Sequence, residues 1–249
     1  MSLQPDTEIP RQSWFKRNEI MITPWLFLTP AILFFMLYVI FPIIQSFQVS
    51  AYTWDGLGER DYVGLENYRE LWDDPAFYTS LRNNFIWLFM YLLAIPAGLF
   101  IALFLNQTIP GIRIYKSLFF FPFVISQVVV GLVFTWFYDP TFGLLNSMLG
   151  VIGMGPINVL GDPTYVTYGI IAAGLWPQTA YCMILYLTGL NAVDPEQIEA
   201  ARLDGAKGWK MLWYVIIPQL KPATFIAFVV TIIGALRSFD LISIMTNGG

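Results

Sequence analysis

The sequence predicts an all-α polytopic membrane protein, a bundle of kinked transmembrane helices. Of its 249 residues, 57% are hydrophobic and only 12% are charged, about half the charged fraction of a soluble domain. Five apolar stretches have the roughly 20 residues that a helix needs to cross about 30 Å of hydrocarbon. Helices are favoured because each one satisfies its own backbone hydrogen bonds inside the bilayer.

The five stretches follow one another with polar connections between them. They cover residues 22–47, 85–105, 118–137, 166–190 and 223–245, after an N-terminal tail (1–21) that precedes the transmembrane domain (22–249). The first four contain Pro30, Pro96, Pro122 and Pro177, respectively. Neighbouring helices re-satisfy the backbone groups that a proline frees, so we expect kinked helices around a cavity. The chain ends on Asn247-Gly248-Gly249, a turn signal, and we expect a complete protein to have a sixth span.

Charges in the connections orient these spans. The tail holds three basic residues, and the linker after the second span holds Arg113 and Lys116 and no acid. The loop 48–84 is rich in acid, and the loop 138–165 has two aspartates and no base. By the positive-inside rule the N-terminus is cytoplasmic. Counting spans places the polar segment 191–222 on the same face.

This polar segment, called the hairpin (191–222) below, predicts two short amphipathic helices. Asp194-Pro195-Glu196 is a strong helix start, because Asp caps free amides, Pro fits the first turn and Glu complements the helix dipole. The first helix covers 194–204 and ends at Gly205, and the second covers 207–217 and ends before Pro218. From physics alone, an interfacial helix pair without a partner is an alternative.

The hairpin resembles the EAA loop of binding-protein-dependent ABC importer permeases. Glu199-Ala200-Ala201 is followed after three residues by Gly205, and after nine more by Val215, one residue and Ile217-Pro218. Val215 and Ile217 replace the usual Ile and Leu. The resemblance implies that this loop docks into a groove of an ATPase subunit and transmits its closure to the spans. The implied coupling residues are Glu199, Ala200, Ala201, Asp204 and Gly205.

Two further segments resemble the carbohydrate branch of these permeases, the maltose, alpha-glucoside and glycerol-phosphate type. They are residues 62–68 (YVGLENY) with 74–77 (DPAF), and residues 239–242 (FDLI) with 246–249 (TNGG). The resemblance implies import of a sugar or oligosaccharide across a bacterial inner membrane. It implies a second homologous permease, a dimer of ATP-binding subunits that holds ATP and Mg, and an external solute-binding protein. The acid-rich loop 48–84 would help to form the docking face for that protein.

Polar groups inside a bilayer are costly and are therefore candidate functional positions. By the same resemblance, the substrate path is expected at Gly174, Gln178 and Tyr181 in the fourth span, Thr231, Ala235 and Ser238 in the fifth, and Gln127 in the third. Helix–helix packing is the alternative for each of them. Arg237 and Asp240 are three apart on the predicted fifth helix and so are able to pair, as a gate or as a structural clasp.

The residue inventory argues against other classes of function. The chain has no histidine, one cysteine and no Gly-x-x-x-x-Gly-Lys-Ser/Thr phosphate loop. We therefore expect no catalysis and no cofactor in this chain, with ATP on a partner. A net charge of −4, scattered along the chain, does not favour nucleic acid, and lipid is the expected surroundings. An ion-coupled secondary transporter, which needs ionisable groups near mid-membrane, is the main alternative, and an assembly scaffold is another.

Overall fold

The computed structural model describes residues 14–248, which form two units, one ending at Phe77 and one beginning at Tyr78. The predicted tail lies partly outside the described residues, and its remainder is helical. In the first unit α1 (Trp14–Phe35), the π-helix η1 (Met36–Ile40) and α2 (Phe41–Val49) run on without a break. A short antiparallel hairpin of β1 (Tyr52–Thr53) and β2 (Asp61–Tyr62) follows, and then α3 (Glu66–Asp73).

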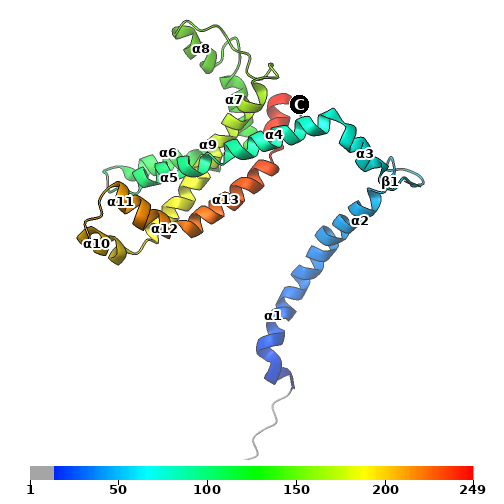
Figure 1. Ribbon diagram of the computed structural model, residues 1–249, viewed down its shortest axis with the longest axis horizontal. Coiled ribbons are helices and arrows are strands. Elements are labelled where there is room, and N and C mark those ends of the chain that lie inside the picture. Colours follow the sequence, from blue (N-terminus) through cyan, green and yellow to red (C-terminus); the bar gives the residue numbers. More distant parts are fainter. Residues whose placement is uncertain (1–13, 249) are drawn as a thin grey trace, which may run out of the picture. The chain divides into compact units, whose positions relative to one another are not determined.

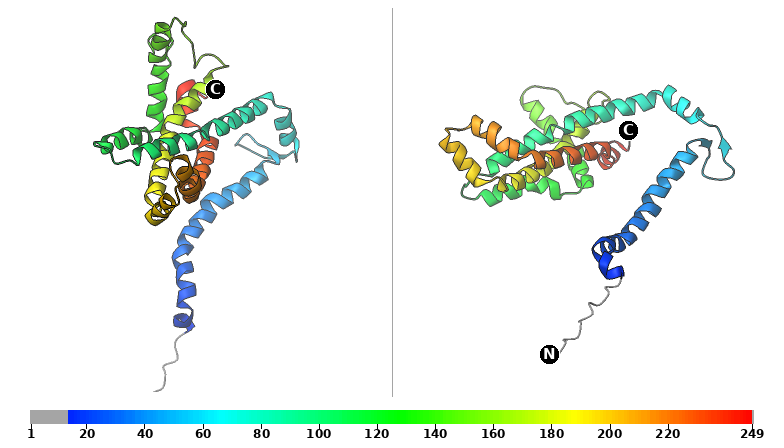
Figure 2. Two further views of the ribbon diagram at one scale, coloured as in Figure 1. Left: turned by 60° about the vertical axis from the view of Figure 1, so that its left-hand side comes forward. Right: turned by 60° about the horizontal axis from the view of Figure 1, so that its bottom comes forward.

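The second unit is built around one long helix. It contains α4 (Pro75–Tyr91, whose first three residues belong to the first unit), α5 (Ala94–Leu105), α6 (Ile112–Val124), α7 (Gln127–Phe137), α8 (Leu144–Val151), α9 (Val166–Asn191), α10 (Pro195–Leu203), α11 (Trp209–Met211), η2 (Leu212–Ile216), α12 (Ile217–Gln219), α13 (Lys221–Leu236) and α14 (Asp240–Thr246). Helices α5, α6 and α13 pack along α9 (Figure 1). The hairpin (191–222) lies at the C-terminal end of α9, in gold and orange in both views of Figure 2.

The membrane-span prediction is confirmed in kind but changed in detail. Among the described residues, three helices are long and apolar enough to span a membrane: 18–49, 75–105 and 166–191. The predicted five are reached only if two bent helix pairs each count as one span. These pairs are α6 with α7, bent by 99°, and the α11–α12 helix with α13, bent by 69°.

The prediction of a single helix over 118–137 was wrong. The chain breaks at Ile125 and Ser126, and Ser126 starts α7 by accepting a hydrogen bond from the backbone N–H of Val129 at 3.4 Å. Pro122 lies one turn before the break. A serine cap inside an apolar run thus ends one helix and begins another. The predicted fifth span is also interrupted, because α13 ends at Leu236 and α14 begins at Asp240.

Three other prolines lie inside helices that continue past them, and of these only Pro218 departs from the prediction. Helices α1 and α9 continue through Pro30 and Pro177. The second hairpin helix does not end before Pro218 but continues to Gln219, after the π-helical turn η2. The first unit repeats this arrangement, with η1 ahead of Pro42. A proline lacks one N–H and crowds the carbonyl four residues back, and a wider π-turn relieves that crowding.

Two large apolar clusters, with a smaller one of Ala94, Cys182 and Ala227, hold the second unit together. One includes Trp87, Ile171 and Leu241 and joins α4, α9 and α14. At the same end, the loop after α7 is tied to α9, because the buried Tyr138 hydroxyl donates to the carbonyl of Gly169 at 3.1 Å, and burial raises the Tyr138 pKa. The other cluster includes Tyr186 and joins α5, α9 and the start of α13 at the opposite end of α9.

Candidate functional site

The first helix of the hairpin (191–222) begins and ends as predicted. The Asp194 side chain accepts a hydrogen bond from the backbone N–H of Glu196 at 2.9 Å and so caps α10. The helix ends at Leu203, and Gly205 follows at a φ of +83° with no atom near its missing Cβ. Gly205 is therefore required by its left-handed backbone and not by crowding.

The predicted coupling residues lie on the exterior of this helix. Glu199, Ala200, Asp204 and Gly205 are exposed, whereas Ala201 is half-buried. Leu203 follows Glu199 by four residues and thus shares its face, and 89% of its surface is exposed. A leucine this exposed beside a carboxylate forms a mixed apolar and acidic face. Sequence reasoning missed Leu203, although its position one turn after Glu199 was the available signal.

The two ends of the hairpin (191–222) are tied together by one glutamine. The Gln219 side-chain oxygen accepts from the backbone N–H of Asp194 at 3.3 Å, and its nitrogen donates to the carbonyl of Val215 at 3.1 Å. Beneath it, Val193 and Leu220 are buried in the same cluster as Leu190 at the end of α9. The hairpin is thus anchored on the C-terminal end of α9 and the start of α13.

A polar cavity of about 200 Å³, called the polar cavity below, lies at the break between α13 and α14. Its wall contains five of the predicted site residues, Gln127, Gln178, Arg237, Ser238 and Asp240, together with Tyr91, Gly234, Phe239 and Leu241. The cavity therefore brings together side-chain amides, hydroxyls, one cation and one carboxylate. These groups come from α4, α7, α9 and the α13–α14 segment. Such convergence of a few polar groups in an otherwise apolar setting is typical of a ligand site.

The remaining candidates lie behind this wall and not in it. Thr231 is fully buried and accepts a hydrogen bond from the Gln178 side chain at 2.9 Å. Ala235 is buried in the apolar cluster, and a Cβ at Gly174 would overlap with the Tyr91 hydroxyl. Gly174 thereby makes room for Tyr91, and Thr231 orients Gln178.

Tyr181 faces a different neighbour. Its ring stacks on Phe123 of α6, with centroids 5.1 Å apart, and it does not line the polar cavity. It therefore joins α9 to α6 instead of presenting its hydroxyl beside Gln178.

The predicted helical pairing of Arg237 and Asp240 was wrong. The helix is interrupted between them, and no ion pair joins them in the part of the chain that the structure describes. Both are exposed on the wall of the polar cavity. Because the helix is interrupted, Arg237 and Asp240 do not lie one turn apart on the same helix. They are instead two separate polar groups on the wall of the polar cavity.

Tyr91 and Phe239 line the polar cavity but were absent from the predicted set. Tyr91 is a single hydroxyl in the apolar run of α4, and that isolation was the only sequence signal for it. Phe239 belongs to the segment between α13 and α14, and the sequence pattern predicted a continuous helix there.

The arrangement defines a class of protein, a polytopic membrane subunit with a solvent-exposed hairpin and a polar cavity between its apolar helices. The sequence pattern of the family described as "binding-protein-dependent transport system inner membrane component" matches residues 94–249. A probable ABC transporter permease of Pyrococcus horikoshii is 37% identical over 231 residues, covering 90% of this chain and 78% of that protein. The alpha-glucoside transport permease AglF of Rhizobium meliloti is 34% identical, covering 91% of this chain and 68% of that protein.

A solved structure agrees in fold. A bacterial alginate ABC transporter, in complex with a pentasaccharide-bound periplasmic protein, has a chain that superposes with a TM-score of 0.79 at 22% identity, covering 94% of this chain and 79% of that one. The chain belongs to the family of binding-protein-dependent transport system inner membrane components. It is thus a permease subunit of an ABC importer, a transport component and not an enzyme, and this class replaces the ion-coupled alternative.

Proposed function

We propose that this permease imports a sugar or oligosaccharide by alternating access, with its hairpin (191–222) held by a separate ATPase dimer that binds ATP and Mg. A second, related permease and an external solute-binding protein complete the transporter. The chain lies in a bacterial inner membrane with its N-terminus and hairpin in the cytoplasm. The observation that carries the proposal is that α9 contributes Gln178 to the polar cavity and leads at its C-terminal end into a hairpin that exposes Glu199.

Coupling is assigned to the outward face of α10. Glu199 offers a carboxylate to a basic residue of the partner, and Leu203 offers apolar area that is otherwise left in water. Exposed apolar groups of this kind mark protein contacts. Because Gln219 and the buried Leu220 fix the hairpin to α9 and α13, a pull on α10 reaches the cavity-lining helices.

The coupling proposal is tested by Glu199→Arg in the fully assembled transporter. We expect assembly to persist, while uptake and ATPase stimulation by the solute-binding protein fall at least tenfold, since the reversed charge opposes a basic partner. Gln197→Arg, on the opposite side of the same helix and also exposed, is the control. Unchanged coupling in Glu199→Arg would remove Glu199 from this role.

The choice of a sugar rests on the groups around the polar cavity and on the resemblance to the alpha-glucoside permease. Amide and hydroxyl groups recognise the hydroxyls of a sugar, and aromatic rings such as Tyr91 and Phe239 pack on its C–H faces. Arg237 and Asp240 carry opposite charges, so the cavity has no net preference for a charged solute.

Gln178→Ala tests the cavity. We expect a weaker apparent affinity for an alpha-glucoside in proteoliposome uptake, with ATPase coupling retained. The exposed Gln45→Ala is the matched control. A wild-type concentration dependence for Gln178→Ala would contradict a solute site beside Gln178, and failure of any sugar to compete for uptake would contradict the sugar assignment.

A further inference from the structure

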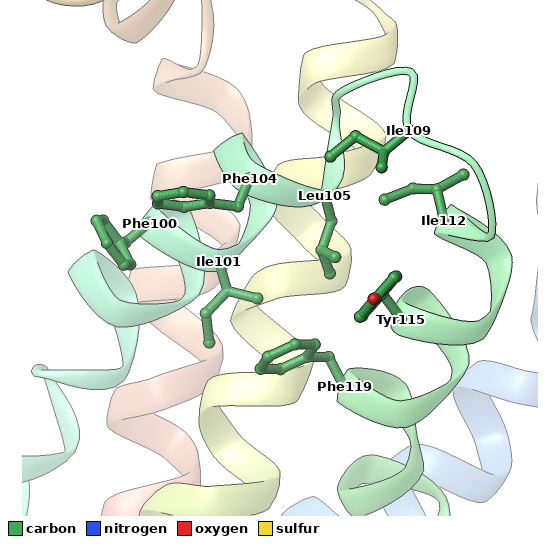
Figure 3. Close-up of a pocket in the computed structure, with 8 residues that line it drawn as sticks. All are labelled: Phe100, Ile101, Phe104, Leu105, Ile109, Ile112, Tyr115 and Phe119. Atoms are coloured by element: carbon green, nitrogen blue, oxygen red, sulfur yellow. The ribbon is translucent and has the colours of Figure 1, made fainter.

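An apolar cavity of about 410 Å³ opens between α5, the linker after it and α6 (Figure 3). It lies beside the ends of two membrane-embedded helices and has almost no polar wall apart from one tyrosine hydroxyl. The main lining side chains are Ile101, Phe104 and Leu105 from α5, Ile109 from the linker, and Tyr115 and Phe119 from α6. Several of them remain markedly exposed, including Phe104 at 56% and Tyr115 at 52%.

Positive charge borders this apolar cavity. The segment 106–117 contains Arg113 and Lys116 and no acidic residue. Lys116 lines an adjoining cavity of about 250 Å³ between α6 and α9. Neither cation forms an ion pair with another residue that the structure describes. In sequence, Arg113 directly follows Ile112 and Lys116 directly follows Tyr115, and Ile112 and Tyr115 both line the apolar cavity. Two cations without an ion pair among the described residues therefore neighbour its lining residues in the chain.

We propose that the apolar cavity binds one acyl chain of an anionic membrane phospholipid, whose phosphate is held by Arg113 and Lys116. The volume falls at the lower end of the range for small-ligand sites, about 300–1,000 Å³. Long basic side chains at the end of a span extend to the headgroup region. Each one near an anionic headgroup favours it by about fivefold.

The site is connected to the hairpin (191–222). Leu105 and Ile112 form part of the cavity wall and also pack in the cluster that contains Leu190 and Leu220 at the base of the hairpin. A bound acyl chain therefore supports the apolar cluster on which the hairpin stands. This places an anionic lipid where it stabilises the elements that pass a movement from α10 to α9.

The test uses the transporter assembled with its partner subunits, in nanodiscs of phosphatidylcholine that contain phosphatidylglycerol with a photoreactive acyl chain. Labelled peptides are mapped by mass spectrometry. We expect labelling to concentrate on residues 100–119 and to exceed that by photoreactive phosphatidylcholine. Arg113→Gln combined with Lys116→Gln should lower this preference by about 25-fold, two steps of fivefold, and Arg113→Lys with Lys116→Arg should keep it.

A second variant pair tests the cavity itself. Ile109→Trp fills it from an exposed linker position and should reduce the labelling several-fold. Ile114→Trp, on the 74% exposed side of α6, should leave it unchanged, and co-purification of the partners verifies assembly of both. Equal labelling by both lipids, or wild-type labelling of Ile109→Trp, would overturn the proposal. Cross-linking of Ile109→Cys to a second permease in place of lipid would overturn it as well.

Discussion

The close packing of α5 on α9 depends on one glycine and gives a sharp prediction. A Cβ added at Gly98 would lie 2.6 Å from the Cβ of Cys182, 2.7 Å from the backbone nitrogen of Met183 and 2.9 Å from the carbonyl carbon of Cys182. Two of these three atoms belong to the backbone, so no rotamer change relieves the contact. Gly98→Ala must therefore push the two helices apart.

The expected magnitude follows from two opposing effects. Overpacking a well-filled interface costs about 1–3 kcal/mol, and replacing glycine by alanine in a helix returns about 0.5–1 kcal/mol. We expect a net loss of about 1–2 kcal/mol in the free energy of unfolding. At roughly 2–4 °C per kcal/mol, the Tm falls by several degrees, and by more in Gly98→Val.

Cys182 supplies the assay. It is fully buried and is the only cysteine of the chain. In a transporter whose partner subunits carry no cysteine, reaction with a thiol-reactive fluorophore during heating therefore reports the opening of the interface between α5 and α9. Gly150→Ala in α8 is the control, because its added Cβ meets nothing within 4 Å. If Gly98→Ala reacted at the wild-type temperature, the close approach of α5 to α9 would be refuted.

Three further substitutions have defined outcomes. Asp194→Ala should destabilise α10 by about 1 kcal/mol through loss of its cap, seen as faster amide exchange, whereas Asp194→Asn should not; equal exchange in both would exclude the cap. Gln178→Leu should lower the free energy of unfolding by only about 0.6 kcal/mol, the average for a hydrogen bond within a membrane, and a loss above roughly 2 kcal/mol would show a larger structural role than the Thr231 contact explains. Tyr138→Phe should cost about 1 kcal/mol in thermal unfolding, because only the bond to Gly169 is removed; an unchanged Tm would argue against that bond.

Local chemistry made the hairpin (191–222) predictable. Asp194 caps its own helix two residues on, and Gly205 adopts a conformation that few other residues tolerate, so both signals act within a few positions. The breaks in the membrane helices were harder to predict. Helix α9 continues through Pro177, in keeping with the expectation that prolines do not end these helices, whereas Ser126 starts a new helix inside an apolar run.

The candidate site was predictable only in part. Gln127, Gln178 and Ser238 were selected because polar groups in a bilayer are costly, and the structure brings them to one cavity. Which candidate lines that cavity and which supports it depends on the rotation of each helix about its axis. Thr231 faces Gln178, for example, and sits behind the wall.

Hydrophobicity, capping and turn preferences are properties of neighbouring residues, so the membrane class, the approximate spans and the two-helix form of the hairpin (191–222) were predictable from the sequence. Tertiary structure decided the rest. Gln178 and Thr231 are 53 residues apart, and Tyr91 reaches their neighbourhood only because Gly174 leaves space for its hydroxyl. These side-chain contacts depend on how closely the helices pack and on where each helix breaks. Helix packing and helix breaks are in turn set by contacts between segments far apart in the chain.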